Sequence, residues 1–536
     1  MFLAFKSNKL LLFFLILFCL FIFFTGLGNY GLLDKDEPRY AGCALEMLQN
    51  NDFLVPKFNF QYRFDKPVLY YWLIAASYKL FGVSDFTSRI PSALCAVFCV
   101  LFTWYTSTVV LGRLRGFVCA LVLLTSIEYI LLGRRAATDI ALCFFFSATL
   151  YSLFLGYYFK NLKIKIFWTI FSGVFAGLAV LTKGPIGIIL PLIVLACFLA
   201  TRKNFDLKHI KIFFIISFLA VLISFPWYFA VHCVTKGEFT RVFFFEHNLN
   251  RFTSVVGEHP GPIWFYVPVI IGGFMPWTFL FLNSIFNLSK RLSKKNFNKL
   301  ILFCFIWAFV VFLFFSLSTT KLATYILLLF PPLSIITGYW ISVLGLKNMR
   351  FLKTILKLTV LAFLPALVYA IYLILKWKIT SLEKNMILFE VSSVLLFMIL
   401  ALILCFKFYK KYNSLISVFS MLLTVSLVSI LNFYLVPYYK HTHEELRHFA
   451  ELAKEARVKE IISFGMYRPS LAYYSRVPVN FDEKKSQIQK IKQYYLESAK
   501  QDIFLIGHSS DINKHKKLFQ NVAVIEMGKK YFVARL

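Results

Sequence analysis

The stretch LLFFLILFCLFIFFTGLGNYGLLDKDEPRYAGCALEMLQNN, residues 11–51, joins a long uncharged run to a dense cluster of charges. Its first half is apolar over a length that can cross a bilayer as one helix, for which roughly 17 to 25 residues suffice. Asp34, Asp36, Glu37 and Arg39 then follow within a few positions of one another. We therefore expect a membrane span that ends beside an acidic motif.

An amphipathic helix is expected to begin inside this motif. Pro38 suits the first turn of a helix, where its missing N–H is not needed. Apolar residues then recur at three- and four-residue spacing from Tyr40 to Leu48. Two interpretations of the carboxylates stay open: Asp36 or Glu37 caps the helix and complements its dipole, or both belong to a catalytic centre.

The whole chain has the composition of a membrane protein. Of its 536 residues, 59% are hydrophobic and 19% aromatic, and the mean hydropathy is +0.71. About thirteen segments are apolar over a length that can span a bilayer. Their approximate cores are residues 10–27, 88–111, 116–133, 138–159, 165–182, 185–201, 211–231, 263–287, 299–316, 323–345, 353–376, 386–408 and 414–437. No small-residue cleavage site follows the first run, so we interpret it as a retained span.

The formal charge of +32 does not indicate nucleic-acid binding, because the basic residues are not gathered on one soluble domain. They fall in every second loop between the apolar segments, as around residues 160–165, 202–208 and 290–295. By the positive-inside rule those loops are cytoplasmic. The pattern predicts a multi-pass membrane protein with its N-terminus in the cytoplasm and its C-terminal tail on the outer side of the membrane.

The first outer loop, residues 28–87, contains the opening pattern twice. Asp65, Lys66 and Pro67 precede a second helical stretch, as the acidic motif precedes the first. Both helices are expected to lie in the outer membrane interface. Two helix N-termini, together with Arg39 and Lys66, would bind an anion.

Asp139 stands at the start of the fourth apolar segment. A carboxylate at that depth is costly and marks a functional site. The alternative is a salt bridge to Arg134 or Arg135 that fixes the helix end. Lys183, at the end of another segment, is interpreted as a lysine that snorkels to the membrane surface.

The outer loop at residues 232–262 holds further candidates. Glu246, His247, Glu258 and His259 could meet around a divalent ion such as Zn²⁺, Mg²⁺ or Mn²⁺, although their spacing matches no standard metal motif. The guanidinium fork of Arg251 suits a phosphate, or else pairs with Glu246 one turn away.

Tyr325 follows Lys321 by four residues, so the two side chains would share one helix face near the outer surface. Tyr325 either contributes to a binding site or anchors the helix in the membrane interface.

After residue 437 the long apolar segments end and the sequence becomes that of a soluble tail. Helical and strand-like stretches alternate through residues 438–536, which predicts a small soluble α/β domain after a membrane domain of residues 1–437. This tail has no glycine-rich phosphate loop. We expect it to contact an acceptor or to stabilise the fold, and not to perform the chemistry.

Together these motifs resemble the polyprenyl-phosphate-dependent membrane glycosyltransferases, which include protein mannosyltransferases, and among them the bacterial aminoarabinose transferases that modify lipid A. The matching motifs are DEPRYA (36–41), FDKPVLYYW (64–72), Asp139 after RRAAT, EHNLNRF (246–252), HPGPIWFY (259–266), KLATYILLLFPP (321–332) and FGMYRPSLAYY (464–474). One departure is Asp65, where relatives often have glutamate.

The resemblance implies a fold of the GT-C type, about thirteen transmembrane helices with interfacial periplasmic helices and a small C-terminal α/β domain. It also implies a lipid-linked sugar donor on undecaprenyl phosphate and lipid A as acceptor. The implied roles are reaction-centre carboxylates for Asp36, Asp139 and the adjacent Glu37; donor-phosphate contacts for Lys66, Arg251, Tyr325 and Arg39; and metal contacts for Asp65, Glu246, His247 and His259.

Two other functions remain open. A mannosyltransferase acting on protein hydroxyls would share the same membrane half. A lipid or sugar transporter would also carry charges in the membrane, but no inverted repeat or pair of broken spans is evident in the sequence.

Overall fold

The computed structural model describes residues 8–201, 207–254, 260–289, 297–347, 372, 439, 443–482, 502–514 and 523–535. The chain forms two compact units. The first comprises Met1–Leu27, Phe64–Tyr70 and Arg89–Phe433, and the second comprises Gly28–Arg63, Tyr71–Ser88 and Tyr434–Leu536. The domain boundary expected at residue 437 stays a prediction.

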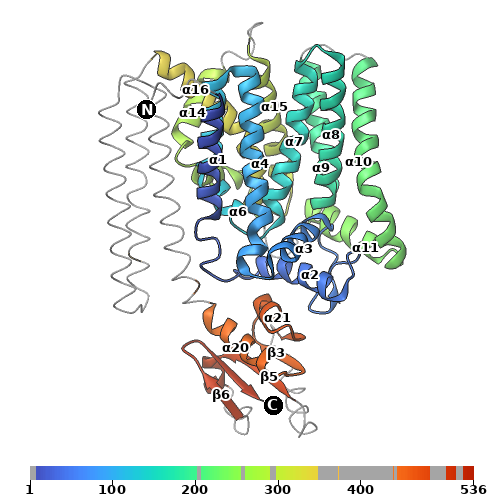
Figure 1. The fold of residues 1–536 in the computed structure, drawn as a ribbon, viewed down its shortest axis with the longest axis vertical. Coiled ribbons are helices and arrows are strands. Elements are labelled where there is room, and N and C mark those ends of the chain that lie inside the picture. The colour runs from blue at the N-terminus through green and yellow to red at the C-terminus, as the bar shows by residue number, and fades with distance from the viewer. Residues whose placement is uncertain are drawn as a thin grey trace. The chain divides into compact units, whose positions relative to one another are not determined.

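The first unit is helical (Figure 1). Its elements are α1 (Asn8–Phe24), the greater part of α4 (Asp85–Leu111), α5 (Arg113–Leu124), α6 (Ile127–Gly133), α7 (Thr138–Tyr158), α8 (Leu162–Lys183), α9 (Ile186–Thr201), α10 (Leu207–Val234), α11 (Glu238–Arg241), η2 (Val242–Leu249), α12 (Asn250–Thr253), α13 (Tyr266–Gly273), α14 (Thr278–Ser289), α15 (Lys299–Leu317), η3 (Ala323–Leu329) and α16 (Phe330–Lys347).

The described residues include 6 helices that are long and apolar enough to cross a membrane, or up to 8 if each of two bent pairs is one span. Each lies in a segment where the sequence predicts a span, and the shorter apolar helices α1 and α9 match two more. The predicted class, a polytopic α-helical membrane protein, is confirmed. The spans expected at 353–376, 386–408 and 414–437 lie outside the described residues, so the total of about thirteen stays a prediction.

The span expected at 116–133 is bent by 68° between α5 and α6. The hydroxyls of Thr125 and Ser126 donate to the carbonyls of Leu121 (2.6 Å) and Val122 (2.7 Å), one turn back. Such bonds compete with the helical ladder and bend helices. The span expected at 263–287 is likewise bent, by 117°, between α13 and α14.

Helix α8 packs between α7 and α10. Two glycines four residues apart allow its approach to α10: a Cβ added at Gly173 would lie 2.7 Å from the Leu219 Cβ, and one at Gly177 would lie 2.8 Å from the Ile223 Cβ. Small residues at this spacing let membrane helices pack closely. The packing fixes the two helix ends that carry Asp139 and Lys183.

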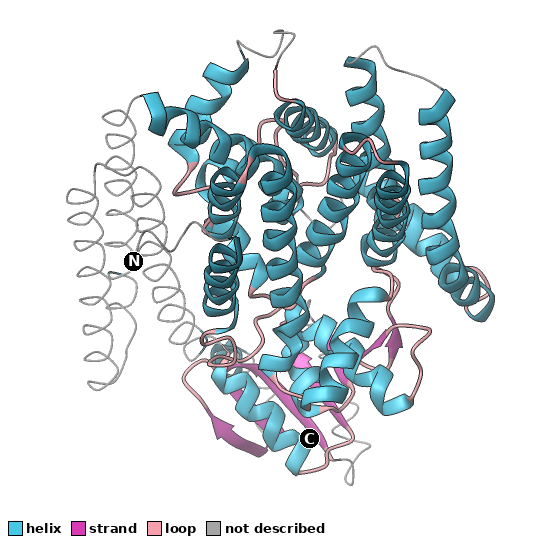
Figure 2. Ribbon diagram, turned by 45° about the horizontal axis from the view of Figure 1, so that its top comes forward, coloured by secondary structure: helices cyan, strands magenta, loops and turns pink. Residues whose placement is uncertain are grey.

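The second unit combines helices with strands, and all strands in the described part of the chain belong to it (Figure 2). Its elements are α2 (Asp36–Asn50), β1 (Lys57–Phe58), β2 (Gln61–Tyr62), most of α3 (Leu69–Phe81), α20 (Glu444–Glu455), β3 (Glu460–Phe464), α21 (Pro469–Ser475), β4 (Val479–Asp482), β5 (Ile503–His508), α23 (Ser509–Lys514), β6 (Ala523–Met527) and β7 (Tyr531–Arg535).

The tail contributes a five-stranded sheet in the order β4-β3-β5-β7-β6. Strand β3 pairs in parallel with β4 and β5, whereas β7 pairs antiparallel with β5 and β6. Its buried core includes Phe464, Leu505 and Phe532. The predicted α/β character of the tail is confirmed, and the polar helix expected near 486–500 lies outside the described residues.

Candidate active site

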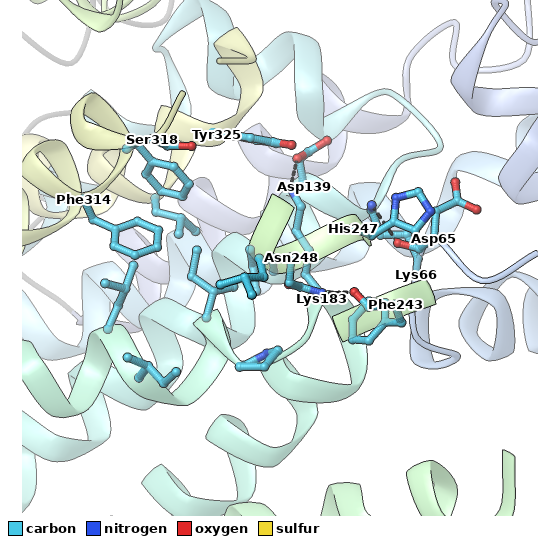
Figure 3. A pocket seen from close by; sticks show the side chains of 18 of the residues that line it. Asp65, Lys66, Asp139, Lys183, Phe243, His247, Asn248, Phe314, Ser318 and Tyr325 are labelled. Atoms are coloured by element: carbon cyan, nitrogen blue, oxygen red, sulfur yellow. Dashed lines mark hydrogen bonds and ion pairs between the residues drawn. The ribbon is translucent and has the colours of Figure 1, made fainter. Parts of the chain in front are cut away.

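A cavity of about 390 Å³ opens in the first unit. Polar and charged side chains gather in one part of it, and apolar side chains from α9, α15 and η3 line the rest (Figure 3). The lining residues are Asp65, Lys66, Asp139, Leu142, Lys183, Pro185, Ile186, Ile189, Leu190, Phe243, Phe244, His247, Asn248, Leu249, Phe314, Phe315, Ser318, Thr324, Tyr325 and Leu328. The walls suit a hydrocarbon chain, and the charged part suits a polar head.

The charged part is organised by Asp139 and Lys183. Asp139 lies in the first turn of α7 and Lys183 ends α8, and the Lys183 Nζ is 2.5 Å from the Asp139 Oδ1. Both side chains are only 15% exposed. The Lys183 Nζ also lies 4.7 Å from the centre of the Tyr325 ring. The interpretation of Lys183 as a snorkelling lysine was wrong, because its ammonium turns to a carboxylate inside the protein.

Asp139 thus pairs with a cation 44 residues away in sequence rather than with its neighbour Arg134. Arg134 is buried and donates to the carbonyls of Ile22 (2.6 Å) and Thr25 (2.7 Å), at the end of α1. The alternative of a salt bridge from Asp139 to Arg134 or Arg135 is therefore wrong, because the ion pair of Asp139 is with Lys183.

The segment that precedes α3 contributes two more charged groups to the cavity. They are the carboxylate of Asp65 and the ammonium of Lys66. The Lys66 Nζ donates to the backbone carbonyl of Asp65 at 2.9 Å (Figure 3). The lining therefore holds two ammonium groups and two carboxylates, from segments far apart in the sequence.

The metal candidates do not come together in the described part of the chain. Asp65 and His247 both line the cavity. Glu246 instead pairs with Arg241 at 2.9 Å on an exposed surface, and His259 lies outside the described residues. No group of three or more His, Cys, Asp or Glu side chains that could hold a metal occurs among the described residues. They do not form a complete metal site.

The acidic motif belongs to the second unit. Asp36 and Glu37 open α2, with Lys35 at the N-cap position, so both carboxylates lie in the first turn. Asp36 pairs with Arg39, whose Nε also donates to the Lys35 carbonyl at 3.0 Å. Glu37 is fully buried and accepts a hydrogen bond from the Leu33 N–H at 2.8 Å.

Of the residues expected at the reaction centre or the donor phosphate, Lys66, Asp139 and Tyr325 line the cavity. Asp36, like Glu37 and Arg39, belongs to the second unit. The backbone of Arg251 lies in α12, and its side chain lies outside what the structure describes. Lys183 was missed as a site residue, although a carboxylate as deep as Asp139 calls for a cationic partner.

Comparisons with known proteins agree with this architecture. A family model described as dolichyl-phosphate-mannose-protein mannosyltransferase matches residues 65–229. An uncharacterized protein of Aquifex aeolicus is 33% identical over 61% of this chain and 73% of its own length. The undecaprenyl phosphate-alpha-4-amino-4-deoxy-L-arabinose arabinosyl transferase of Shewanella sediminis is 30% identical over 60% of this chain, and the match spans 58% of that protein.

Among solved structures, ArnT from Cupriavidus metallidurans bound to undecaprenyl phosphate superposes with a TM-score of 0.82 at 20% identity, over 98% of this chain and 97% of that one. The chain therefore shares the fold of this membrane protein, and its long apolar helices are those of a multi-pass membrane protein. Over these stretches the chain is similar to polyprenyl-phosphate-dependent glycosyltransferases, among them the aminoarabinose transferases.

Proposed function

We propose that this protein transfers 4-amino-4-deoxy-L-arabinose, or a related sugar, from undecaprenyl phosphate to lipid A on the periplasmic side of the inner membrane. The observation that carries the proposal is the cavity, which brings Lys66, Lys183 and Asp139 together beside apolar walls. The name of the Shewanella sediminis relative supports this donor and sugar.

The lysines of the cavity would hold the donor phosphate. Lys183 uses one of its three N–H groups on Asp139, so it retains donors for phosphate oxygens, and Lys66 brings a second positive charge to the same cavity. Hydrogen bonds between charged partners are about twice as strong as neutral ones. Tyr325, whose ring centre lies 4.7 Å from the Lys183 Nζ, would add a further contact, while the roles of Arg251 and Arg39 stay predictions.

The reaction breaks the bond between the anomeric carbon and the phosphate oxygen, and the bonding electrons leave with the phosphate. Lys66 and Lys183 would stabilise that growing negative charge. Asp139 would stabilise the positive character at the anomeric carbon or accept the proton of an acceptor hydroxyl, and the same role for Asp36 stays a prediction. If the acceptor is a phosphate of lipid A, it is already ionised, and positioning suffices.

A divalent ion stays a prediction. Asp65 and His247 are the described candidate ligands that share the cavity. No step above depends on such an ion.

The proposal is tested by replacing the two carboxylates one at a time. Asp139→Asn and Asp36→Asn should each abolish transfer by the purified, folded protein, while Glu246→Gln should retain activity because Glu246 is exposed and pairs with Arg241 outside the cavity. Mass spectrometry of lipid A from deletion and complemented strains identifies the sugar. Near-normal product from the Asp36 variant would remove Asp36 from the reaction centre.

A second candidate, transfer of a sugar to protein hydroxyls, is favoured by the mannosyltransferase model that matches residues 65–229. The same strains separate the two functions. Loss of a sugar from extracted glycoproteins, with lipid A unchanged, would replace the first proposal by the second.

A further inference from the structure

Asp34 is a buried carboxylate that the chemistry above does not use. Its side chain is 1% exposed. Both of its oxygens accept hydrogen bonds from one residue of the tail, Ser470 in α21: Oδ1 from the backbone N–H at 2.9 Å and Oδ2 from the hydroxyl at 2.6 Å. A buried carboxylate is costly unless it is fully bonded, so Asp34 ties the chain just before Asp36 to α21.

A second contact holds the same segment. The Leu32 N–H donates to the Tyr474 hydroxyl at 2.7 Å, and that hydroxyl donates to Asp85 at 2.9 Å. Arg447 of α20 pairs with Asp85 at 3.0 Å, and its guanidinium lies 4.7 Å from the centre of the Tyr474 ring. Asp85 and Arg447 therefore hold the Tyr474 side chain in place independently of its hydrogen bond with Leu32.

These contacts leave little freedom to the backbone that leads into α2. Tyr474 bonds it at Leu32, Ser470 bonds it at Asp34, and the buried Glu37 bonds back to the Leu33 N–H. Ser470 and Tyr474 lie one helical turn apart on α21, a short helix buried for most of its length. One element of the tail thus holds two successive points of the acidic segment, and all of these residues belong to the second unit.

We propose that Ser470 and Tyr474 are positioning residues for the transfer reaction: through Asp34 and Leu32 they hold the backbone of residues 32–37 in the conformation that Asp36 needs for its role. This inference rests on the proposed function. If the proposal holds, the tail takes part in catalysis by positioning Asp36. This role differs from acceptor contact and from general stabilisation of the fold, which the sequence predicted for the tail. Catalytic groups must be held close to their productive geometry, and a small displacement is enough to slow the reaction.

The test compares two variants with matched controls. Ser470→Ala and Tyr474→Phe remove the two hydroxyls that reach the acidic segment. Ser463→Ala and Tyr473→Phe remove buried hydroxyls of the same tail that bond elsewhere, to the Met466 carbonyl at 2.9 Å and to the Tyr78 hydroxyl at 3.2 Å. Ser470→Thr keeps a hydroxyl at the first position and should restore function.

We expect Ser470→Ala and Tyr474→Phe to lower kcat by about tenfold to a hundredfold, with the donor KM changed less than about twofold, as loss of positioning predicts. Amide hydrogen exchange at Leu32 and Leu33, followed by mass spectrometry, should accelerate in both. The two controls should keep wild-type kcat and wild-type exchange in this segment, even if they lower Tm as much as the test variants do.

Three results decide the proposal. Wild-type kcat in Ser470→Ala and Tyr474→Phe would overturn it, whether or not exchange at Leu32 accelerates. An equal fall of kcat in the control variants would also overturn it, because the effect would then be general destabilisation. If the wild-type protein transfers no sugar although the Leu32 and Leu33 amides are protected from hydrogen exchange, the proposed function is refuted. The positioning role, which rests on that function, then falls with it.

Discussion

The Lys183 ammonium lies 2.5 Å from the Asp139 carboxylate and joins the last residue of α8 to the first turn of α7. Each charge also complements the dipole of its own helix, since an acid stabilises an N-terminus and a base a C-terminus. The pair faces the cavity. One contact therefore serves both the packing of two membrane helices and the placement of the charged groups.

Removing one partner of this pair should cost more than removing both. Lys183→Met or Asp139→Asn leaves the other group buried without its counter-charge, a loss of roughly 3 to 5 kcal/mol when a buried pair is broken. The double variant should recover much of the lost Tm and still make no product. A thermal melt in detergent beside a transfer assay measures both, and additive losses of Tm would show that the two charges do not depend on each other.

Lys66→Gln should weaken binding of undecaprenyl phosphate by about tenfold to a hundredfold, because a hydrogen bond to a charged group contributes roughly 1.5 to 3 kcal/mol. Lys79→Gln is the matched control, since Lys79 is exposed in the last turn of α3 and does not line the cavity. Equilibrium binding of the carrier lipid to the detergent-solubilised protein gives the comparison. Equal affinities of the two variants would remove Lys66 from the phosphate site.

His443 should make the second unit sensitive to acid. Burial, aided by the positive charge of Arg468, lowers the pKa of His443 to about 4, so the imidazole is neutral at pH 7 and its 3.9 Å approach to Asp34 is not an ion pair. An unfolded histidine titrates near pH 6.5. The unfolded chain therefore binds more protons between about pH 6.5 and 4, and stability falls as the pH falls through that window.

His443→Gln should remove this part of the acid sensitivity, which amounts to up to about 3 kcal/mol. The charged groups near the imidazole are Asp34, Glu37, Arg468 and Lys530. Burial raises the pKa of Asp34, and this acts in the opposite direction. Asp34 is present in both proteins, so the difference in Tm between wild type and variant from pH 7 to 4.5 reports His443. His448→Gln, at an exposed site, should follow the wild type.

Gly177→Leu should destabilise the membrane unit, because the added side chain has no room against Ile223 and the Ala220 carbonyl of α10. Overpacking of this kind typically lowers the free energy of unfolding by about 1 to 3 kcal/mol. Gly272→Leu introduces the same side chain where a Cβ would meet nothing within 4 Å, and should leave Tm nearly unchanged. Similar Tm values for both variants would mean that α8 and α10 can separate without cost.

Local patterns predicted much of this fold. The helix that begins around Pro38 is α2, and the strands expected in the tail occur as β3 to β7. Periodicity and turn residues are local signals, and they suffice for such elements. The bend at Thr125 and Ser126 escaped prediction because neither residue breaks a helix by itself.

The contacts that organise the cavity and the acidic segment could not be predicted from local patterns. Lys183 and Asp139 are 44 residues apart, and Ser470 and Asp34 are 436 apart. Neither pairing leaves a periodic signal, because each depends on how whole elements pack. The sequence did indicate that buried charges need partners, and only the structure identifies those partners.

The second unit is assembled from the two ends of the chain, residues 28–63 and 71–88 from the beginning and the tail from residue 434 onward. During synthesis the acidic motif leaves the ribosome early, whereas Ser470 and Tyr474 follow only after several hundred further residues have been made. A nascent or prematurely terminated chain therefore inserts its membrane helices while the motif still lacks these hydrogen-bonding partners. The acidic segment therefore reaches its final hydrogen bonding only after α21 has been synthesised.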